Sequence, residues 1–479
     1  MEKNCFEELR QAVRTGVQLP GMVGIPLIRS FSTRSIRKFS SSGGGLPVLG
    51  KILPLLILGG TIAVVVVRPG KAGASYGVVA GGLAVLLLGL VTPAQALTIW
   101  RENAGVLLLL AGLLMLATAA GKAGFFDWCA WLTVQTARQN GYRLFFATVI
   151  LSAVTTVFFS LDTTAVILTP VIYIMAVKLR MDPVPFLYAG IFTANTASLI
   201  LPVSNLTNLL LIGQLHVPFG PYLLHLALPG LVAVGVSAAL LFYYFRHRIR
   251  PGFDAGLLAG FRREGTQARF FSVARVIILL TLGAFLVLSL AEWPLYPVAL
   301  AAAAAAWAAG IRYGQLRPGQ LLSNVPWQLF FFVLGLEMVV QGVENTGLVV
   351  ALGKWMVLAL QHSLWVGLLV IVFGSTAAAN LINNIPAVML AIAALKTAPG
   401  LPAALALPLY SAVLVGTNLG PNLTLSGSLA TMLWFLVVRH QGHELAAGEF
   451  FRVGIRITPV VLLFTTLALA LNFLLLGGR

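Results

Sequence analysis

The chain has 479 residues, of which 59% are hydrophobic and 9% are charged, and its formal net charge is +17. A water-soluble domain needs a more polar surface than this composition supplies, so we expect a polytopic membrane protein. The two cysteines, Cys5 and Cys129, exclude a disulfide framework and a thiolate metal cluster.

Residues 1–45 form a segment of a different kind, because they are rich in serine and arginine. Glu2, Glu7 and Glu8 argue against a transit peptide, and no apolar core with a cleavage site marks a signal peptide. We therefore expect a flexible cytoplasmic extension or a misassigned start codon.

Long apolar runs follow, among them residues 52–67, 106–120, 223–245 and 457–476. About 20 apolar residues suffice to cross a bilayer as a helix. The sequence therefore predicts an all-α fold with about ten to twelve membrane segments, some of them re-entrant.

The basic residues gather in two places, residues 29–51 and 246–275. In a membrane protein such clusters mark cytoplasmic segments, whereas in a soluble protein they would suggest nucleic acid. We expect both segments on the cytoplasmic side of the inner membrane. Residues 46–245 and 276–479 are then two membrane halves, joined by the linker 246–275.

Polar residues interrupt the apolar pattern twice in the first half. The first interruption, residues 160–164, separates two short apolar segments and contains Asp162. It predicts a helical hairpin that dips into the membrane. The second interruption, residues 193–208, contains Pro202 and predicts a broken helix. Freed backbone groups survive in a bilayer only where protein or a polar cavity satisfies them.

The longer interruption returns in the second half, at residues 416–431. Placing Ser204 on Gly427 gives an offset of 427 − 204 = 223 residues, and the same offset places Asn195 on Asn418. We therefore expect the two halves to be repeats. Paired interruptions in two halves are the best sequence pointer to the binding site of a transporter.

A second hairpin is predicted at residues 380–386. We place its Asn383 and Asn384 opposite Leu161 and Asp162 of the first hairpin. Asp162 is then the one acid among the four polar tips, two from each half.

Asparagine, serine and threonine in membrane helices often only join neighbouring helices by hydrogen bonds. Four clusters in repeated order, beside glycine or proline, instead favour a substrate or ion site near the midplane, because helix packing needs no broken backbone. The candidate residues are Asp162, Thr163, Thr164, Asn195, Thr196, Ser198, Ser204, Asn205, Asn383, Asn384, Thr417, Asn418, Asn422, Thr424, Ser426 and Ser428.

Two carboxylates, Asp162 and Glu337, lie well inside apolar segments. Charged groups are costly there and are usually functional. Asp162 is the first candidate for binding a proton or a cation. Glu337 is a second candidate for proton coupling, or alternatively a neutral packing residue held by hydrogen bonds.

Residues 418–434 resemble the arsenite efflux permeases of the ion transporter superfamily, and the likeness extends to residues 165–170, 195–199, 383–386 and 450–454. The resemblance implies an inverted repeat with two re-entrant hairpins, two broken helices and a scaffold against which a transport unit moves. It also implies export of trivalent arsenic or antimony, in exchange for protons or assisted by a separate ATPase subunit.

The sequence departs from the superfamily at three positions. Asn195 and Asn418 stand where we expect charged members to carry acids, and Asn422 stands where we expect a basic residue. Uncharged amides suit a neutral ligand such as arsenous acid, a trihydroxide that exchanges hydrogen bonds with them. Silicic acid and boric acid have similar hydroxyl surfaces, so exporters of those solutes remain open.

We therefore expect a secondary transporter that exports arsenite, and antimonite as a further substrate, with proton entry through Asp162. A sodium/proton antiporter is the alternative, and a passive channel is a third. No ATP-binding loop or catalytic constellation is present, so we expect no enzyme activity, no cofactor and no metal site. The expected partners are membrane lipid and the coupling ion; nucleic acid is excluded, and a homo-oligomer stays open.

Overall fold

The computed structural model describes residues 46–67, 74–254, 267–320 and 327–476. The expectations for residues 1–45 lie outside this part of the chain. Within it the regular elements are helices, and nine of them are long and apolar enough to cross a membrane by length and composition. The chain is therefore an all-α polytopic membrane protein, as predicted.

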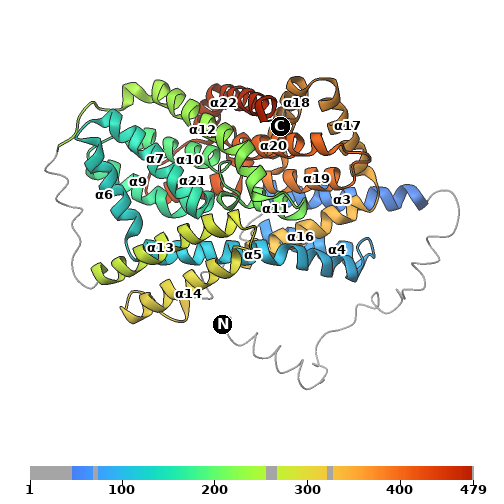
Figure 1. Ribbon diagram of the computed structural model, residues 1–479, viewed down its shortest axis with the longest axis horizontal. Helices are drawn as coiled ribbons and strands as arrows, with labels where there is room; N and C mark the ends of the chain where they lie inside the picture. Colours follow the sequence, from blue (N-terminus) through green and yellow to red (C-terminus); the bar gives the residue numbers. More distant parts are fainter. Residues whose placement is uncertain (1–45, 68–73, 255–266, 321–326, 477–479) are drawn as a thin grey trace, which may run out of the picture. The chain divides into compact units, whose positions relative to one another are not determined.

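The helices of the first half are α3 (Leu46–Val67), α4 (Ala74–Leu87), α5 (Pro93–Lys122), α6 (Phe125–Ala137), α7 (Gly141–Phe159), α8 (Leu161–Thr163), the π-helical turn η1 (Thr164–Leu168), α9 (Thr169–Lys178), α10 (Pro183–Ala197), the 3-10 turn η2 (Pro202–Ser204), α11 (Leu206–Gln214), α12 (Phe219–Phe245) and η3 (Arg246–Arg248) (Figure 1). Those of the second half are α13 (Gln267–Leu290), α14 (Tyr296–Arg312), α16 (Trp327–Glu344), α17 (Leu348–His362), α18 (Leu364–Ile382), α19 (Asn384–Lys396), α20 (Ala403–Leu419), η5 (Gly420–Asn422), η6 (Leu425–Gly427), α21 (Leu429–His440) and α22 (Ala447–Leu476).

The offset of 223 residues relates helices throughout the two halves. It carries the bounds of α7, residues 141–159, onto residues 364–382, which are the bounds of α18. It also relates Gly124 to Gly347, which precede α6 and α17 with positive φ angles of 72° and 76°. The two halves are therefore structural repeats.

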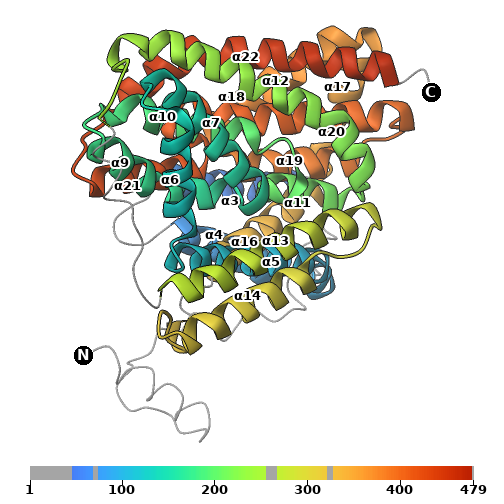
Figure 2. The same ribbon diagram turned by 60° about the vertical axis from the view of Figure 1, so that its left-hand side comes forward.

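Helices α12 and α22, which are equivalents in the two repeats, lie side by side and run in opposite directions (Figure 2). Near the start of α22, Arg456 Nη1 donates to Tyr244 Oη at the end of α12 over 3.2 Å. Near the end of α22, Asn472 Nδ2 donates to Leu224 O near the start of α12 over 2.9 Å. Equivalent helices that run antiparallel are related by a two-fold axis across them, so the repeat is inverted.

The inverted repeat also relates the first described helices of the two halves. Helices α3 and α13 are equivalents, because their last residues, Val67 and Leu290, differ by 223. Equivalent helices of inverted repeats enter the membrane from opposite sides.

Helix α7 and the helical run through α8, η1 and α9 make the first hairpin, which turns at Ser160 alone with φ 122°. Its two ends lie together beside the start of the linker. Gly141 N donates to Pro251 O over 2.9 Å, and a Cβ on Gly141 would lie 2.8 Å from Met181 Cε. Helices α18 and α19 make the second hairpin, which turns at Asn383 alone with φ 76°.

These turns correct the predicted alignment of the hairpins by one residue. Ser160 and Asn383 are equivalents, because they differ by 223 and share the same unusual backbone conformation. Asn384 therefore corresponds to Leu161, and Asp162 corresponds to Ile385. One offset thus describes both the hairpins and the broken helices.

The predicted broken helices are both present. The breaks span residues 198–205, between α10 and α11, and residues 420–428, between α20 and α21. Pro202 and Pro421 lie in the 3-10 turns inside them. Proline has no N–H to donate, so its place outside the regular helix costs no helical hydrogen bond.

A further group of helices packs against the hairpins and broken helices. Within it, α4 meets α16 where a Cβ on Gly82 would lie 2.9 Å from Gly335 Cα, and α5 meets α14 where a Cβ on Gly112 would lie 2.7 Å from Ala299 Cβ. Small residues permit such close approach of membrane helices. We call α4, α5, α13, α14 and α16 the scaffold helices; they lie together along the lower side of Figure 2.

Candidate functional site

The two hairpin tips and the two breaks meet around one small cavity, which we call the central cavity. The first tip contributes Asp162, the second contributes Asn384, and the breaks contribute Asn205 and Ser428. The cavity has a volume of about 20 Å³, which is room for one water molecule. The remaining described residues that line it are Leu161, Leu206, Leu329, Ile385, Leu429 and Ala430.

Four helix N-termini face the central cavity, because each polar lining residue stands at the start of a helix. Asn205 caps α11 by accepting from Thr207 N over 3.3 Å, and Ser428 caps α21 by accepting from Thr431 N over 3.0 Å. Asn384 is the first residue of α19, and Asp162 lies in the first turn of the run that continues into α9. Helix N-termini present N–H groups and partial positive charge, so they favour electron-rich oxygen atoms.

Asn384 is the lining residue that points most directly to a ligand. Its side chain is 3% exposed, and its Oδ1 accepts no hydrogen bond from the described residues. A buried amide oxygen without a donor costs about 1–3 kcal/mol. A ligand hydroxyl group would recover that free energy.

Asp162 is the titratable residue among the described residues that line the central cavity. The described lining contains no Lys or Arg, so the Asp162 carboxylate forms no salt bridge within the cavity. Membrane-embedded carboxylates of this kind mark ion or proton pathways. Asp162 is therefore free to bind a proton or a ligand hydroxyl.

Asn418 does not line the cavity but holds the first break in place. It accepts from Asn205 Nδ2 over 3.1 Å and from Thr207 Oγ1 over 2.7 Å, and its own Nδ2 donates to Asn208 Oδ1 over 2.6 Å. These bonds join α20 of the second half to α11 of the first. Thr207 and Asn208 were not among the predicted site residues, although the repeat places Asn208 opposite Thr431.

Asn195 plays the equivalent part for the second break. Its Nδ2 donates to Asn422 Oδ1 over 2.8 Å and to Thr431 Oγ1 over 3.3 Å. Asn422 Nδ2 in turn donates to Phe192 O over 3.3 Å. The three asparagines that replace expected charges thus bind protein groups, and they connect the two halves around the cavity.

Three of the predicted hydroxyl residues bond to carbonyl groups of their own helix. Thr196 donates to Phe192 O over 3.0 Å, Thr417 donates to Val413 O over 2.9 Å, and Ser198 donates to Asn195 O over 2.9 Å. Their donor capacity is used locally.

Three other predicted hydroxyl residues form hydrogen bonds that hold the first hairpin in place. Thr164 shares a hydrogen bond of 2.8 Å with Thr156, and Thr163 N donates to Ser160 Oγ over 3.3 Å. Ser204 donates to Val157 O over 3.1 Å, which joins the first break to α7.

The remaining predicted residues fix the second hairpin to the second break. Asn383 Nδ2 donates to Ser426 O over 3.1 Å, and Thr424 Oγ1 donates to Asn380 Oδ1 over 2.7 Å. Asn380 also donates to Gly420 O over 2.9 Å, although it was not a predicted site residue.

Glu337 of α16 lies outside the central cavity. It is 8% exposed, and its two carboxylate oxygens accept from Asn103 Nδ2 of α5 and from Gln214 Nε2 of α11. Neither amide is among the predicted site residues, because both stand close to predicted helix ends. Among the described residues there is no group of three or more His, Cys, Asp or Glu side chains that could bind a metal ion.

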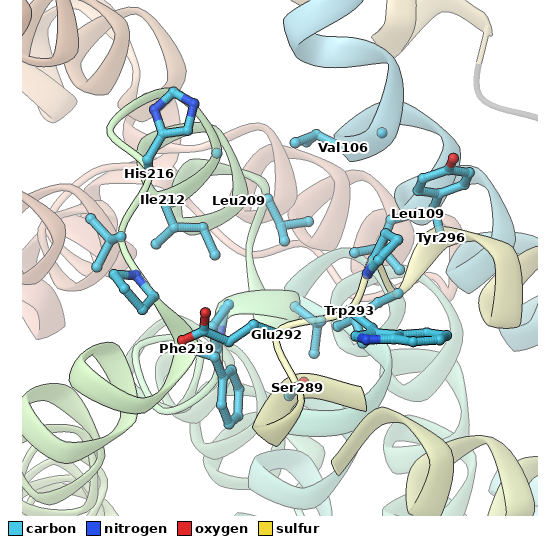
Figure 3. A pocket seen from close by; sticks show the side chains of 18 of the residues that line it. Val106, Leu109, Leu209, Ile212, His216, Phe219, Ser289, Glu292, Trp293 and Tyr296 are labelled. Carbon is cyan, nitrogen blue, oxygen red and sulfur yellow. The ribbon is translucent and has the colours of Figure 1, made fainter. Parts of the chain in front are cut away.

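A larger, open cavity of about 470 Å³, which we call the lateral cavity, lies between α5, α11 and the turn from α13 to α14. Figure 3 shows Leu209 and Ile212 of α11 facing this space, with Glu292 of the turn close by. Phe219, at the start of α12, also lines it. The linker follows the other end of α12. Pro202, inside the first break, forms part of its wall.

Comparison with known proteins shows what the chain as a whole is similar to. A family model described as "Arsenical pump membrane protein" matches residues 53–473. The arsenical pump membrane protein of Escherichia coli (strain K12) is 29% identical over 417 residues, which cover 86% of this chain and 96% of the relative. A relative of the same description from Yersinia enterocolitica is 29% identical over 383 residues, covering 78% and 87%.

The fold is also similar to a solved structure. Neisseria gonorrhoeae MtrF, described as illuminating a class of antimetabolite efflux pumps, superimposes with a TM-score of 0.56 at 15% identity. The match covers 91% of this chain and 97% of that one. At this identity the likeness concerns the fold alone.

Proposed function

Because the chain belongs to the arsenical pump membrane protein family, we propose that it exports arsenite, with antimonite as a further substrate, by secondary active transport through the central cavity. The family membership makes it a membrane transporter of the arsenical pump type. The choice of substrate, the coupling ion and the residues that act are the parts that we propose.

The observation that carries the proposal is the chemistry of the central cavity. Arsenous acid is neutral and offers three hydroxyl groups, each a donor and an acceptor. Asn384 Oδ1, which has no donor of its own, would accept from one hydroxyl, and the Asp162 carboxylate would accept from another. The N–H groups at the helix N-termini would donate to the ligand oxygens. No cysteine lies in the described lining, so hydrogen bonds rather than thiolates would hold the ligand.

The ligand needs more room than the cavity of about 20 Å³ provides. Binding therefore requires the hairpin tips and breaks to separate. The two ends of the first hairpin lie beside the linker, where Gly141 N donates to Pro251 O, so we place its opening there. The second hairpin, its inverted equivalent, opens on the other side. Alternate movement of the two tips against the scaffold helices would expose the cavity to one side and then the other.

Proton exchange follows from Asp162 if the ligand and the proton occupy its carboxylate in turn. A carboxylate accepts hydrogen bonds from the ligand, and the same group binds a proton once the ligand has left. Asp162 would then carry protons inward as the ligand moves outward.

We propose that the linker faces the cytoplasm, because it carries Arg246, Arg248, Arg250 and Arg275. The first hairpin then opens to the cytoplasm, and the lateral cavity faces the outside.

Transport by everted vesicles tests the proposal. Vesicles that contain the protein should accumulate arsenite above equilibrium when a proton gradient is imposed, and a protonophore should abolish the accumulation. Sodium-dependent loss of the pH gradient without arsenite transport would instead indicate the sodium/proton antiporter. Proton-driven uptake of silicic acid alone would move the substrate to another neutral hydroxylated solute. Uptake that never exceeds equilibrium would indicate a channel.

A further inference from the structure

Glu337 joins two parts of the protein that move relative to each other in the proposed transport cycle. It lies on the scaffold helix α16, and Asn103, one of its partners, lies on the scaffold helix α5. Its other partner, Gln214, is the last residue of α11. The first residue before α11 is Asn205, which lines the central cavity. A bond at one end of this short helix therefore bears on the position of the cavity residue at its other end.

The fold itself does not require an acid at this place. The repeat relates Glu337 to Leu114 and Gln214 to Val437, because each pair differs by 223. Apolar residues thus occupy the equivalent positions of the other half. Burying an acid and an amide is costly compared with apolar packing. The pair formed by Glu337 and Gln214 is therefore an addition that one half carries and packing does not explain.

The charged groups that act on Glu337 are Lys396 of α19, Glu102 of α5 and Glu344 on its own helix. Lys396 Nζ lies 3.4 Å from Glu102 Oε2, so the lysine is shared with another acid. Glu337 is held by two neutral amides and has no cation within salt-bridge distance among the described residues. Its ionised form is held by two hydrogen bonds and has no direct ion pair, which leaves protonation within reach.

Protonation changes what the carboxyl group can bind. An ionised carboxylate accepts from both amides, whereas a protonated acid presents an O–H donor at one oxygen. A proton on Oε1, the oxygen that faces Gln214 Nε2, places two donors against each other and breaks that contact. Asn103 Oδ1 is buried and accepts no hydrogen bond from the described residues. Turning the Asn103 amide would offer that oxygen, at the loss of its 2.8 Å bond to Ile99 O.

We infer that Glu337 is a proton-dependent clasp: its carboxylate holds α11 against the scaffold helices, and its protonated form releases α11. The lateral cavity lies close to the clasp, because Glu102 and Gly213, the sequence neighbours of Asn103 and Gln214, both line it. The inference deepens the proposed proton coupling and rests on it for its role in transport. The clasp itself does not depend on which solute is carried.

Thiol labelling without arsenite tests the clasp. Cys5 and Cys129 are replaced by serine, and a reporter cysteine is introduced by Val217→Cys, just after α11 in the lateral cavity, or by Ser289→Cys, on α13 in the same cavity. Both proteins, reconstituted in liposomes, are labelled with a membrane-impermeant maleimide between acidic and alkaline pH. The labelling rate at Val217→Cys is divided by the rate at Ser289→Cys, because this ratio removes the pH dependence of the thiol chemistry.

The ratio should rise by roughly tenfold on acidification, which is the shift expected for losing one hydrogen bond to a charged group. Glu337→Gln should give, at every pH, the ratio that the parent protein shows at acidic pH. Glu344→Gln, on the same helix, should keep the response of the parent protein. Gln214→Leu removes the contact with Glu337 but keeps the acid, so it should also abolish the change of the ratio with pH. This variant provides the test if Glu337→Gln does not fold.

A ratio that does not change with pH in the parent protein overturns the clasp, as does an unchanged response in Glu337→Gln or Gln214→Leu. Arsenite is absent from these measurements. A failure of arsenite export in vesicles would therefore leave the labelling result standing, and a failure of the clasp would leave export standing.

Discussion

Ser160 and Asn383 occupy the same position in the two repeats, and each turns a membrane hairpin as a single residue with positive φ, 122° and 76°. Both residues also cap the helix that follows, Ser160 by accepting from Thr163 N and Asn383 by accepting from Ile385 N. Residues other than glycine are strained in this part of backbone space, and such strain gathers at functional sites. Here it places the start of each helix against the central cavity.

This strain predicts an unusual ranking of substitutions at Asn383. Asn383→Ala should destabilise the protein more than Asn383→Gly. Both variants lose the cap, but only alanine keeps the backbone strain. Asn140, which caps α7 at an ordinary φ of −102°, is the matched control. The difference between alanine and glycine should be larger at Asn383 than at Asn140 by about 1 kcal/mol. Thermal unfolding of the detergent-solubilised variants measures it, and equal differences at the two sites would show that the turn is unstrained.

Asn384→Leu should weaken substrate binding without lowering stability. Its Oδ1 accepts no hydrogen bond from the described residues, so its loss leaves no buried donor unpaired. The hydrogen bond to the ligand is worth about 1.4 kcal/mol, which is roughly tenfold in affinity. The apparent KM for arsenite in vesicles should rise accordingly, at an unchanged melting temperature. An unchanged KM would remove Asn384 from the binding site.

Asn418→Leu should instead lower stability. The substitution removes three hydrogen bonds and leaves Asn205, Thr207 and Asn208 without their buried partner. Each such loss costs about 1–3 kcal/mol. Asn472→Leu, which removes the bonds to Leu224 O and His225 O away from the cavity, is the control for the loss of buried asparagine bonds. Should both variants melt alike yet differ in arsenite transport, Asn418 contributes to the site beyond holding the break.

Asp162→Asn should separate exchange from accumulation. The amide keeps the size of the side chain but cannot carry a proton, so exchange of labelled for unlabelled arsenite should continue. Accumulation driven by a proton gradient should vanish. Asp127→Asn, at an exposed site on α6, is the control and should behave as the parent protein. Normal accumulation by Asp162→Asn would assign coupling to another group.

Gly454 gives a test of packing between α22 and the second break. A Cβ at this position would lie 2.3 Å from Asn422 O and 2.9 Å from Leu423 Cα, so Gly454→Ala must push the break aside. Overpacking of this kind costs about 1–3 kcal/mol and should reduce transport at matched expression. Gly448, on the same helix, has nothing within 4 Å of its Cβ position, so Gly448→Ala should be neutral. Equal activity of the two variants would show that the break tolerates displacement.

The amino-acid sequence by itself determined the class of protein, the repeat and the places where the helices break. Apolar runs of membrane length and polar residues inside them are local features, so they can be read without knowing what packs against them. The offset between Ser204 and Gly427 was enough to align the broken helices. Even the hairpins obey it, although the sequence analysis placed Asp162 one residue away from its true equivalent, Ile385.

Only the tertiary structure decided which polar residues face the central cavity. Asn205 and Asn384 line it, whereas Asn195 and Asn418, which look the same in the sequence, lie outside it and donate hydrogen bonds to residues of the opposite half. The partners of Glu337 likewise come from helices far away in the chain. The inverted two-fold arrangement of the halves determines which side chains line the cavity and which form hydrogen bonds only with a neighbouring helix. No local sequence pattern encodes that arrangement.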